Sequence, residues 1–201
     1  MTAMRQWMAV AVLALGLGWG TAQAADNPRE VVQQASREML SALRANQATL
    51  EQNPEAIYEL VRDILLPHFD FQRMSQWVMG THWRQASPAQ REEFVERFRT
   101  LLVNTYGKAL LGYSNETVVF PETAPPSGDD VTIRSEVTQS GAAPIPITYR
   151  MHNRDGNWKV YDVTVEGVSL VTNYRSQINS LVRREGIDGM LQKLSAENLQ
   201  S

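Results

Sequence analysis

Two carboxylates near the end of the chain are the side chains best placed to do acid–base chemistry. Asp162 lies within an apolar run from Trp158 to Val165, and Glu166 follows it directly. A carboxyl group among apolar neighbours can have a raised pKa and act as a general acid or base. Both also have structural interpretations: Asp162 facing a neighbouring strand or a basic side chain, and Glu166 capping the corner before Ser169. We favour the structural interpretations because no second catalytic group is identifiable.

The other reactive side chains form no site by their spacing. His68, His82 and His152 are far apart and have no carboxylate or cysteine partners at ligand spacing, whereas a metal site needs three or four convergent ligands. The chain has no cysteine and none of the common nucleophile, phosphate-loop or zinc-protease motifs. We therefore expect no catalytic residue, no metal and no cofactor.

Aromatic side chains recur in the long helical and strand patterns. They allow two interpretations: a filled core, or an apolar cavity with phenol hydroxyls near its mouth. The sequence alone leaves both open. The set is Phe98, Tyr106, Tyr113, Tyr149, Tyr161 and Tyr174.

The first residues are typical of a secretory signal peptide. A basic start ending at Arg5 precedes an apolar run over 7–19 and a small-x-small ending at Ala22 and Ala24. The run is shorter than the roughly 20 residues that a membrane-spanning helix needs, which disfavours a retained anchor. We predict a signal peptide over 1–24, with cleavage after Ala24, and one soluble domain over 25–201. Export without cysteine is consistent with the bacterial periplasm.

The charge balance disfavours nucleic acid and anionic lipid surfaces as partners. The full chain has 19 basic and 22 acidic residues, a net charge of -3. Removal of the segment 1–24, whose one charged residue is Arg5, would make the domain slightly more acidic.

Helix signals fill the first half of the domain. Asn27, Asn53, Asp70 and Ser87 each precede an apolar pattern of helical spacing, and three of them are followed within one residue by proline. The pattern that follows Ser87 is the longest and reaches Tyr113. Helical spacing returns at Leu170, stops at Gly186 and resumes in a short last helix.

Between these helices the period changes to that of strands. We predict strands over 117–120, 131–137, 145–151 and 158–165, with a hairpin turn at Asp155-Gly156. In the last strand, simple alternation would put Trp158 and Val160 on one face and Tyr161, Val163 and Val165 on the other. The fold class is therefore α+β: a twisted antiparallel sheet of about four strands, packed against N-terminal helices and a C-terminal helical segment, and enclosing an apolar pocket.

Two blocks of the sequence resemble the MlaC family of periplasmic phospholipid carriers, also called toluene-tolerance proteins. One runs from His68 to Gly107; the other runs from Trp158 to Arg175, with 186–189 beyond it. The loop 121–144 departs most from the family pattern. The resemblance implies a non-enzymatic carrier that moves phospholipid between the outer and inner membranes and maintains outer-membrane lipid asymmetry. It further implies two partners: an inner-membrane ABC transporter complex with an MCE-domain subunit, and an outer-membrane lipoprotein–porin complex.

A phospholipid carrier needs an interior apolar cavity. Exposing acyl chain costs ~0.8 kcal/mol per methylene, so two chains with about 30 methylenes cost roughly 24 kcal/mol, which a shallow groove could not offset. The residues that we expect to form the cavity walls are Phe98, Leu102, Tyr106, Leu110, Ile133, Val137, Ile147, Tyr149, Met151, Tyr161, Val163, Val165, Val168 and Leu170. Weaker candidates for head-group neighbours are Asn104, Lys108, Arg150 and Arg175.

Two other functions remain open at this point. One is an exported enzyme of the small α+β barrel type that uses Asp162 or Glu166 as general base. The other is a carrier with the same pocket for a different apolar ligand.

Overall fold

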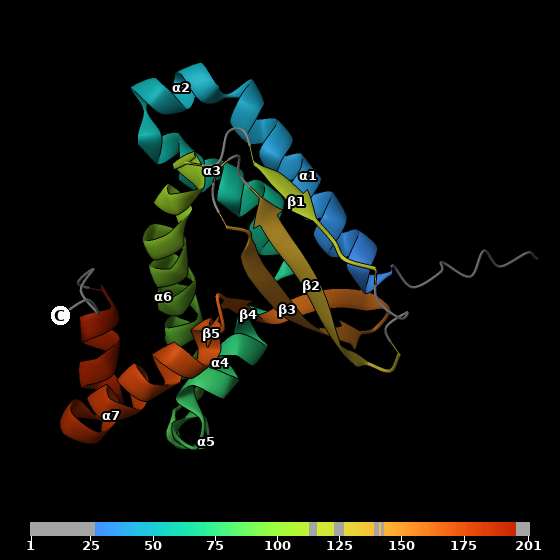
Figure 1. Cartoon of the computed structure of the whole chain (residues 1–201). Helices are drawn as coiled ribbons and strands as arrows, with labels where there is room; N and C mark the ends of the chain where they lie inside the picture. Colours follow the sequence, from blue (N-terminus) through green and yellow to red (C-terminus); the bar gives the residue numbers. More distant parts are fainter. Residues whose placement is uncertain (1–26, 113–115, 123–126, 139–140, 142, 196–201) are drawn as a thin grey trace, which may run out of the picture.

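An antiparallel sheet with helices against both of its faces organises the protein (Figure 1). The computed structural model describes residues 27–112, 116–122, 127–138, 141 and 143–195. The predicted signal peptide and its cleavage site lie outside these residues, as does Tyr113.

The sheet has five strands in sequential order, each antiparallel to the next. The fifth strand is a two-residue segment after the Glu166-Gly167 corner, where the sequence analysis predicted no strand. The α+β class is confirmed, with one short strand more than predicted. The strands are β1 (Thr117–Val119), β2 (Asp130–Thr138), β3 (Ile145–Arg154), β4 (Asn157–Val165) and β5 (Val168–Ser169).

A β-bulge in β4 overturns the prediction of its two faces. Met151 pairs with Val160 and Arg150 pairs with Asp162, so that Tyr161 is the extra residue. An extra residue reverses the alternation beyond it. Val160 and Val163 therefore lie in the same buried cluster, although simple alternation placed them on opposite faces.

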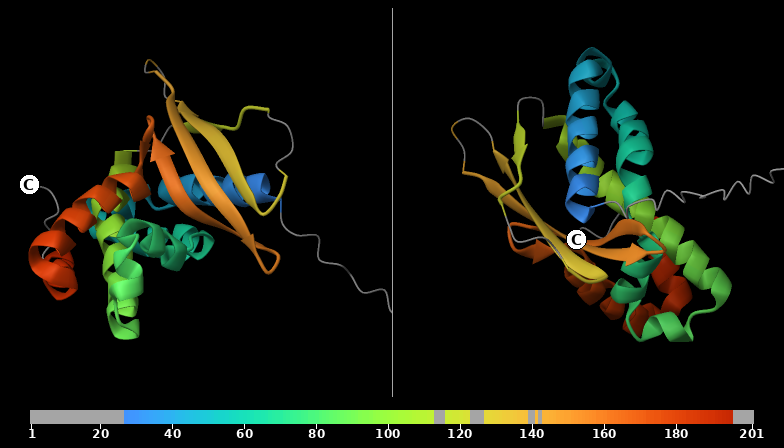
Figure 2. Two further views of the ribbon diagram at one scale, coloured as in Figure 1. Left: turned by 90° about the horizontal axis from the view of Figure 1, so that it is seen from below. Right: turned by 90° about the vertical axis from the view of Figure 1, so that its right-hand side faces the viewer.

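The first helices form a hairpin over one face of the sheet (Figure 2). Asn27 caps α1 by accepting a hydrogen bond from the Arg29 N–H at 3.0 Å. The apolar stripe of α1 includes Val32, which packs on the sheet, and Met39, which packs on the returning helices. The bounds are α1 (Pro28–Ala45), α2 (Gln47–Gln52), η1 (Pro54–Ala56), α3 (Ile57–Leu60), the π-helical η2 (Val61–Leu65) and η3 (Leu66–His68).

The later helices form a second apolar cluster against the other end of the sheet. Asp70 caps the first of them, and Ser87 with Gln90 forms the predicted capping box of the longest one. Gly186, with φ of 72°, breaks the last helix at the predicted position. The bounds are α4 (Phe71–Met79), α5 (His82–Gln85), α6 (Pro88–Gly107), η4 (Lys108–Gly112) and α7 (Leu170–Ser195). Within the described residues, no helix is both long and apolar enough to cross a membrane.

Candidate functional site

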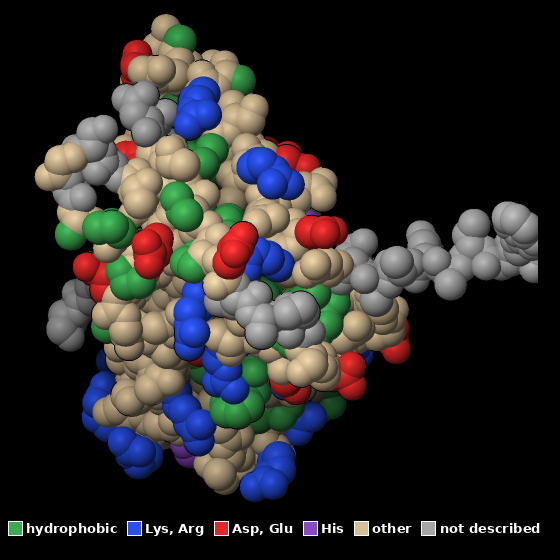
Figure 3. Space-filling model, turned by 45° about the vertical axis from the view of Figure 1, so that its right-hand side comes forward, with side chains coloured by type: hydrophobic (Ala, Val, Ile, Leu, Met, Phe, Trp, Pro, Cys, Tyr) green, Lys and Arg blue, Asp and Glu red, His purple; other side chains and the backbone are tan. Residues whose placement is uncertain are grey.

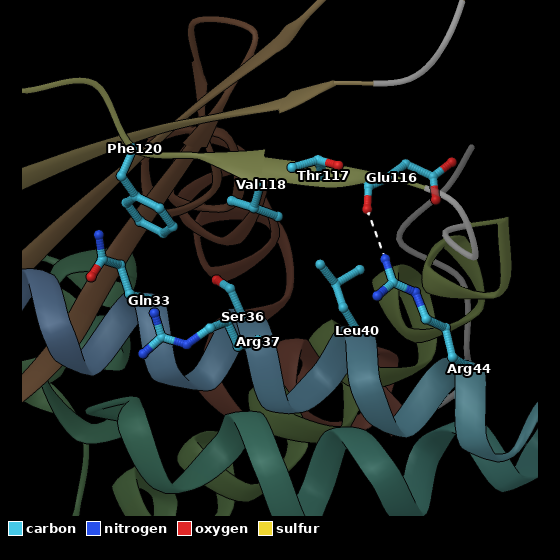
Figure 4. Close-up of a pocket in the computed structure, with 9 residues that line it drawn as sticks. All are labelled: Gln33, Ser36, Arg37, Leu40, Arg44, Glu116, Thr117, Val118 and Phe120. Carbon is cyan, nitrogen blue, oxygen red and sulfur yellow. Dashed lines mark hydrogen bonds between the residues drawn. The ribbon is translucent and has the colours of Figure 1, made fainter.

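A groove of about 410 Å³ lies between α1 and the edge strand β1 (Figure 4). Its α1 side is mostly polar, and its β1 side adds an aromatic ring and an aliphatic side chain. A pocket for a drug-sized molecule has a volume of roughly 300–1,000 Å³, so this groove is at the small end of that range. The lining residues are Gln33, Ser36, Arg37, Leu40, Arg44, Glu116, Thr117, Val118 and Phe120.

Two arginines of α1 fasten β1 across the ends of this groove. Arg29 donates hydrogen bonds to the Phe120 and Pro121 carbonyls at 2.7 and 2.6 Å. Arg44 donates to the Glu116 carbonyl at 3.2 Å. These carbonyls belong to the residues that flank β1, so the two guanidinium groups hold the edge strand at both of its ends. We call Arg29 and Arg44 the two clasps.

The Ser36 hydroxyl in the groove lining is followed by two hydroxyl groups of the sheet. Ser36 points from α1 into the space below Val118 (Figure 4), and its hydroxyl lies near that of Tyr149 in β3. The Tyr149 hydroxyl lies 3.4 Å from Oγ of the buried Ser135 in β2. Burial raises the pKa of Tyr149 above its ordinary value. The phenol therefore stays neutral and can both donate and accept a hydrogen bond.

Behind these hydroxyls lies the apolar cluster between α1 and the sheet. It contains Val32 of α1 and the inward side chains of β2, β3 and β4. Groove, hydroxyl groups and apolar interior thus follow one another from solvent inward. This order would suit an amphipathic ligand, with its polar end in the groove and its apolar end in the interior.

The structure distributes the expected wall residues over several places. The cluster between α1 and the sheet contains seven of them: Ile133, Ile147, Tyr149, Met151, Val163, Val165 and Leu170. The cluster of later helices contains Phe98, Leu102 and Tyr161, and Leu110 packs against the cluster of the N-terminal helices. Val137 is buried in β2, whereas Tyr106 and Val168 are 37% and 57% exposed.

Tyr161 lies apart from the other expected wall residues of the sheet. Its ring stacks on Trp77 of α4 with centroids 6.3 Å apart, and the guanidinium groups of Arg73 and Arg150 lie 4.3 and 4.9 Å from its centroid. The bulge explains this position, because it turns Tyr161 toward α4 while Val160 and Val163 keep facing α1.

None of the four candidate head-group neighbours lines the α1–β1 groove. Lys108 forms an ion pair with Glu55 at 2.9 Å, and Asn104 is exposed on α6. Arg175 lies over Gly80, and Arg150 lies over Trp77 and Tyr161.

The surroundings of Asp162 and Glu166, the two carboxylates considered for acid–base chemistry, favour structural roles for both. The buried Asp162 accepts hydrogen bonds from the Ser169 hydroxyl at 2.8 Å and from the Val171 N–H at 3.2 Å, and so holds the start of α7. In these hydrogen bonds Asp162 contacts the start of the next helix, and not the basic side chain that the sequence analysis considered. Glu166 is exposed at the β4–β5 corner, with φ of 50°. In the described part of the chain, no group of three or more His, Asp or Glu residues is arranged to hold a metal ion.

The sequence analysis missed the polar side of the groove. Ser36, Leu40 and Arg44 each follow a core residue of α1 by one position, so they form a stripe beside the apolar one. Such a stripe is typical of a solvated helix face. Its relation to β1, more than 70 residues away, gives no local signal.

Charge is unevenly distributed over the surface, although the net charge is only -3. In Figure 3, Lys and Arg side chains gather at the lower end of the view. The overall charge is therefore a poor guide to the charge of an individual groove.

Comparison with known proteins adds independent evidence. The family described as MlaC protein matches residues 33–196. The intermembrane phospholipid transport system binding protein MlaC of Haemophilus influenzae is 31% identical over 198 residues, which cover 95% of this chain and 92% of that protein. The toluene tolerance protein Ttg2D of Pseudomonas putida is 33% identical over 166 residues, covering 82% and 77%.

A solved structure has the same fold. It is that of the phospholipid-binding protein from Ralstonia solanacearum in complex with a phospholipid. The TM-score is 0.78 at 30% sequence identity, and the match covers 85% of this chain and 96% of the other.

Proposed function

We propose a function for this chain on the premise that it belongs to the MlaC family: the protein binds phospholipid and carries it through the periplasm. The observation that carries the proposal is the likeness to a protein solved with a phospholipid bound. The name of the Haemophilus influenzae relative, an intermembrane phospholipid transport system binding protein, points the same way. We propose a carrier without catalytic activity.

The order of groups behind the α1–β1 groove supports this function. A phospholipid has a charged head, polar ester groups and long apolar chains. The groove, the Ser36–Tyr149 hydroxyls and the cluster between α1 and the sheet follow in the corresponding order. The acyl chains would enter the interior by parting α1 from the sheet, because the groove alone is too small for them.

The expected wall residues remain part of the proposal. Those around the cluster between α1 and the sheet are the strongest, because Phe120 of the groove lining packs against the same cluster. Ile147→Arg and Val163→Arg would place a charge in that interior, so each should abolish lipid retention while circular dichroism still reports a folded protein. Thr132→Arg, on the exposed side of β2, is the matched control. A folded Ile147→Arg protein with normal lipid content would contradict the assignment.

The cellular setting is a proposal of its own. We infer export by the signal peptide over 1–24 and residence in the periplasm. The partners would be an inner-membrane ABC transporter complex with an MCE-domain subunit and an outer-membrane lipoprotein–porin complex, and the pathway would maintain outer-membrane lipid asymmetry. A mature N-terminus at Ala25 in periplasmic extracts would support export; an unprocessed chain in the cytoplasmic fraction would contradict it.

Native mass spectrometry of protein purified without detergent tests the main proposal. We expect phospholipid in near-stoichiometric amounts, identified after solvent extraction. Protein that is empty and stays empty after incubation with phospholipid liposomes would contradict phospholipid carriage. If the extract contained a different apolar molecule, the protein would still be a carrier, but its ligand would not be phospholipid.

A further inference from the structure

We propose that the α1–β1 groove binds the phosphate of the lipid headgroup and that Arg37 is its principal ligand. This inference rests on the proposed function and adds to it the position and chemistry of the polar end of the site. The groove residues were not among those expected from the sequence, and the four candidate head-group neighbours lie elsewhere.

Hydrogen-bond donors converge at one end of the groove. Figure 4 shows the Arg37 guanidinium beside the Gln33 amide and the Ser36 hydroxyl, below the ring of Phe120. Among the described residues, no hydrogen bond or ion pair engages Arg37. A guanidinium group presents several N–H donors in a planar fork that matches two oxygens of a phosphate. The ligand that fits is therefore an anion rich in acceptor oxygens.

The charged side chains that line the groove are separated along its length. Arg37 lies at the Phe120 end, and Arg44 lies at the other end, where it donates a hydrogen bond to the Glu116 carbonyl. The one acidic side chain in the lining is that of Glu116, and Figure 4 shows its carboxylate at the opposite end, pointing away from Arg37. An anion at Arg37 would gain from this local field.

Ser36 connects this position with the apolar interior. It lines the groove, and its hydroxyl lies near that of the half-buried Tyr149, whose side chain packs against the apolar cluster. A phosphate at Arg37 would place the glycerol and ester groups over these hydroxyls. The acyl chains would then continue between α1 and the sheet. A free phosphate could meet Arg37 by the same chemistry, but it would make no use of the hydroxyls or of the interior.

Isothermal titration of the full-length, delipidated protein with short-chain lipids tests the inference. The probes are dihexanoylphosphatidylglycerol, dihexanoylglycerol, which has the same chains without phosphate, and inorganic phosphate. Arg37→Gln should weaken binding of the phospholipid roughly five- to tenfold and leave binding of dihexanoylglycerol unchanged. Arg37→Lys should retain part of the affinity. Arg183→Gln is the matched control: it makes the same change of charge at an exposed position of α7, away from the groove. This variant should bind like the wild type.

Each contrary result overturns a different statement. Equal phospholipid affinity of Arg37→Gln and Arg183→Gln overturns the role of Arg37 and leaves the carrier function standing. Inorganic phosphate that binds as tightly as the phospholipid, and depends on Arg37, makes the groove a free-phosphate site and overturns the headgroup assignment. Wild-type protein that binds neither lipid overturns the proposed function together with this inference.

Discussion

Nε2 of His152 in β3 lies 2.8 Å from Oδ2 of Asp70, the residue that caps α4. Both side chains are almost fully buried, with 8% and 10% of their surface exposed. The other oxygen of Asp70 accepts the N–H of Arg73 at 2.8 Å. One carboxylate thus begins a helix and fixes that helix to the sheet.

A double-mutant cycle measures this link. Asp70→Ser keeps a capping hydroxyl but removes the contact with His152, and His152→Phe keeps the ring shape but removes its nitrogens. We expect a coupling free energy of about 1–2 kcal/mol in urea unfolding. Purely additive effects of the two substitutions would show that the contact contributes nothing to stability.

His68 should make stability depend on pH. Burial, helped by the nearby Lys159, lowers the pKa of His68 below its ordinary value. The unfolded chain then binds the proton more readily, so this contribution to stability is present above pH ~6.5 and is lost as the pH falls toward the folded-state pKa. Urea unfolding from pH 7.5 to pH 5 should therefore show a smaller loss for His68→Gln than for the wild type. Parallel curves would contradict the prediction.

Asp162→Asn should destabilise the fold without removing an activity. The carboxylate accepts two hydrogen bonds in a buried position at the start of α7, and an amide can replace only one of its oxygens as an acceptor. We expect a loss of about 1–3 kcal/mol in the free energy of unfolding, with bound lipid retained. Asp155→Asn, in the exposed β3–β4 turn, is the matched control and should change stability little. Equal stability of the two variants would contradict the buried role.

Gly80→Ala should be more harmful than Gly112→Ala. Gly80 ends α4 at φ of 56° and ψ of -122°, and an added Cβ would lie 3.2 Å from Nη2 of Arg175. Side chains other than that of glycine are strained there, so we expect a loss of about 1–3 kcal/mol. At Gly112 nothing lies within 4 Å of an added Cβ. Thermal unfolding of the two variants side by side gives the comparison, and equal midpoints would contradict it.

Loss of the two clasps should release β1 from α1. In the double variant Arg29→Gln/Arg44→Gln, hydrogen exchange in peptides covering 116–121 should be about tenfold faster, because hydrogen bonds to three backbone carbonyls are removed. Arg37→Gln lies on the same helix face but removes no such bond, so its exchange should match that of the wild type. Unchanged exchange in the double variant would show that pairing with β2 alone holds the strand.

The local part of the fold could be predicted because its causes lie within a few residues. Asn27, Asp70 and Ser87 cap helices by contacts over two or three positions. The turn at Asp155-Gly156 needs positive φ at both residues, and both have it. These interactions join residues within the same short segment and need no contact from elsewhere in the chain. The resemblance to the family could also be recognised from the sequence, because it rests on the order and spacing of residues and not on their positions in space.

Long-range packing decided the rest. The bulge at Tyr161 places Val160 and Val163 in one apolar cluster with Val32 of α1, a contact between segments far apart in the sequence. Arg29 lies 91 residues from Phe120, its hydrogen-bond partner, and nothing in either segment indicates the other.

The sequence by itself thus determined the class of the fold, the capped starts of α1, α4 and α6, and the family. The tertiary structure decided which face of α1 meets β1, and hence that Arg37 lies in a groove. The physical reason is that a side chain's partners across the sheet depend on register and bulges, which are set by the packing of the whole domain.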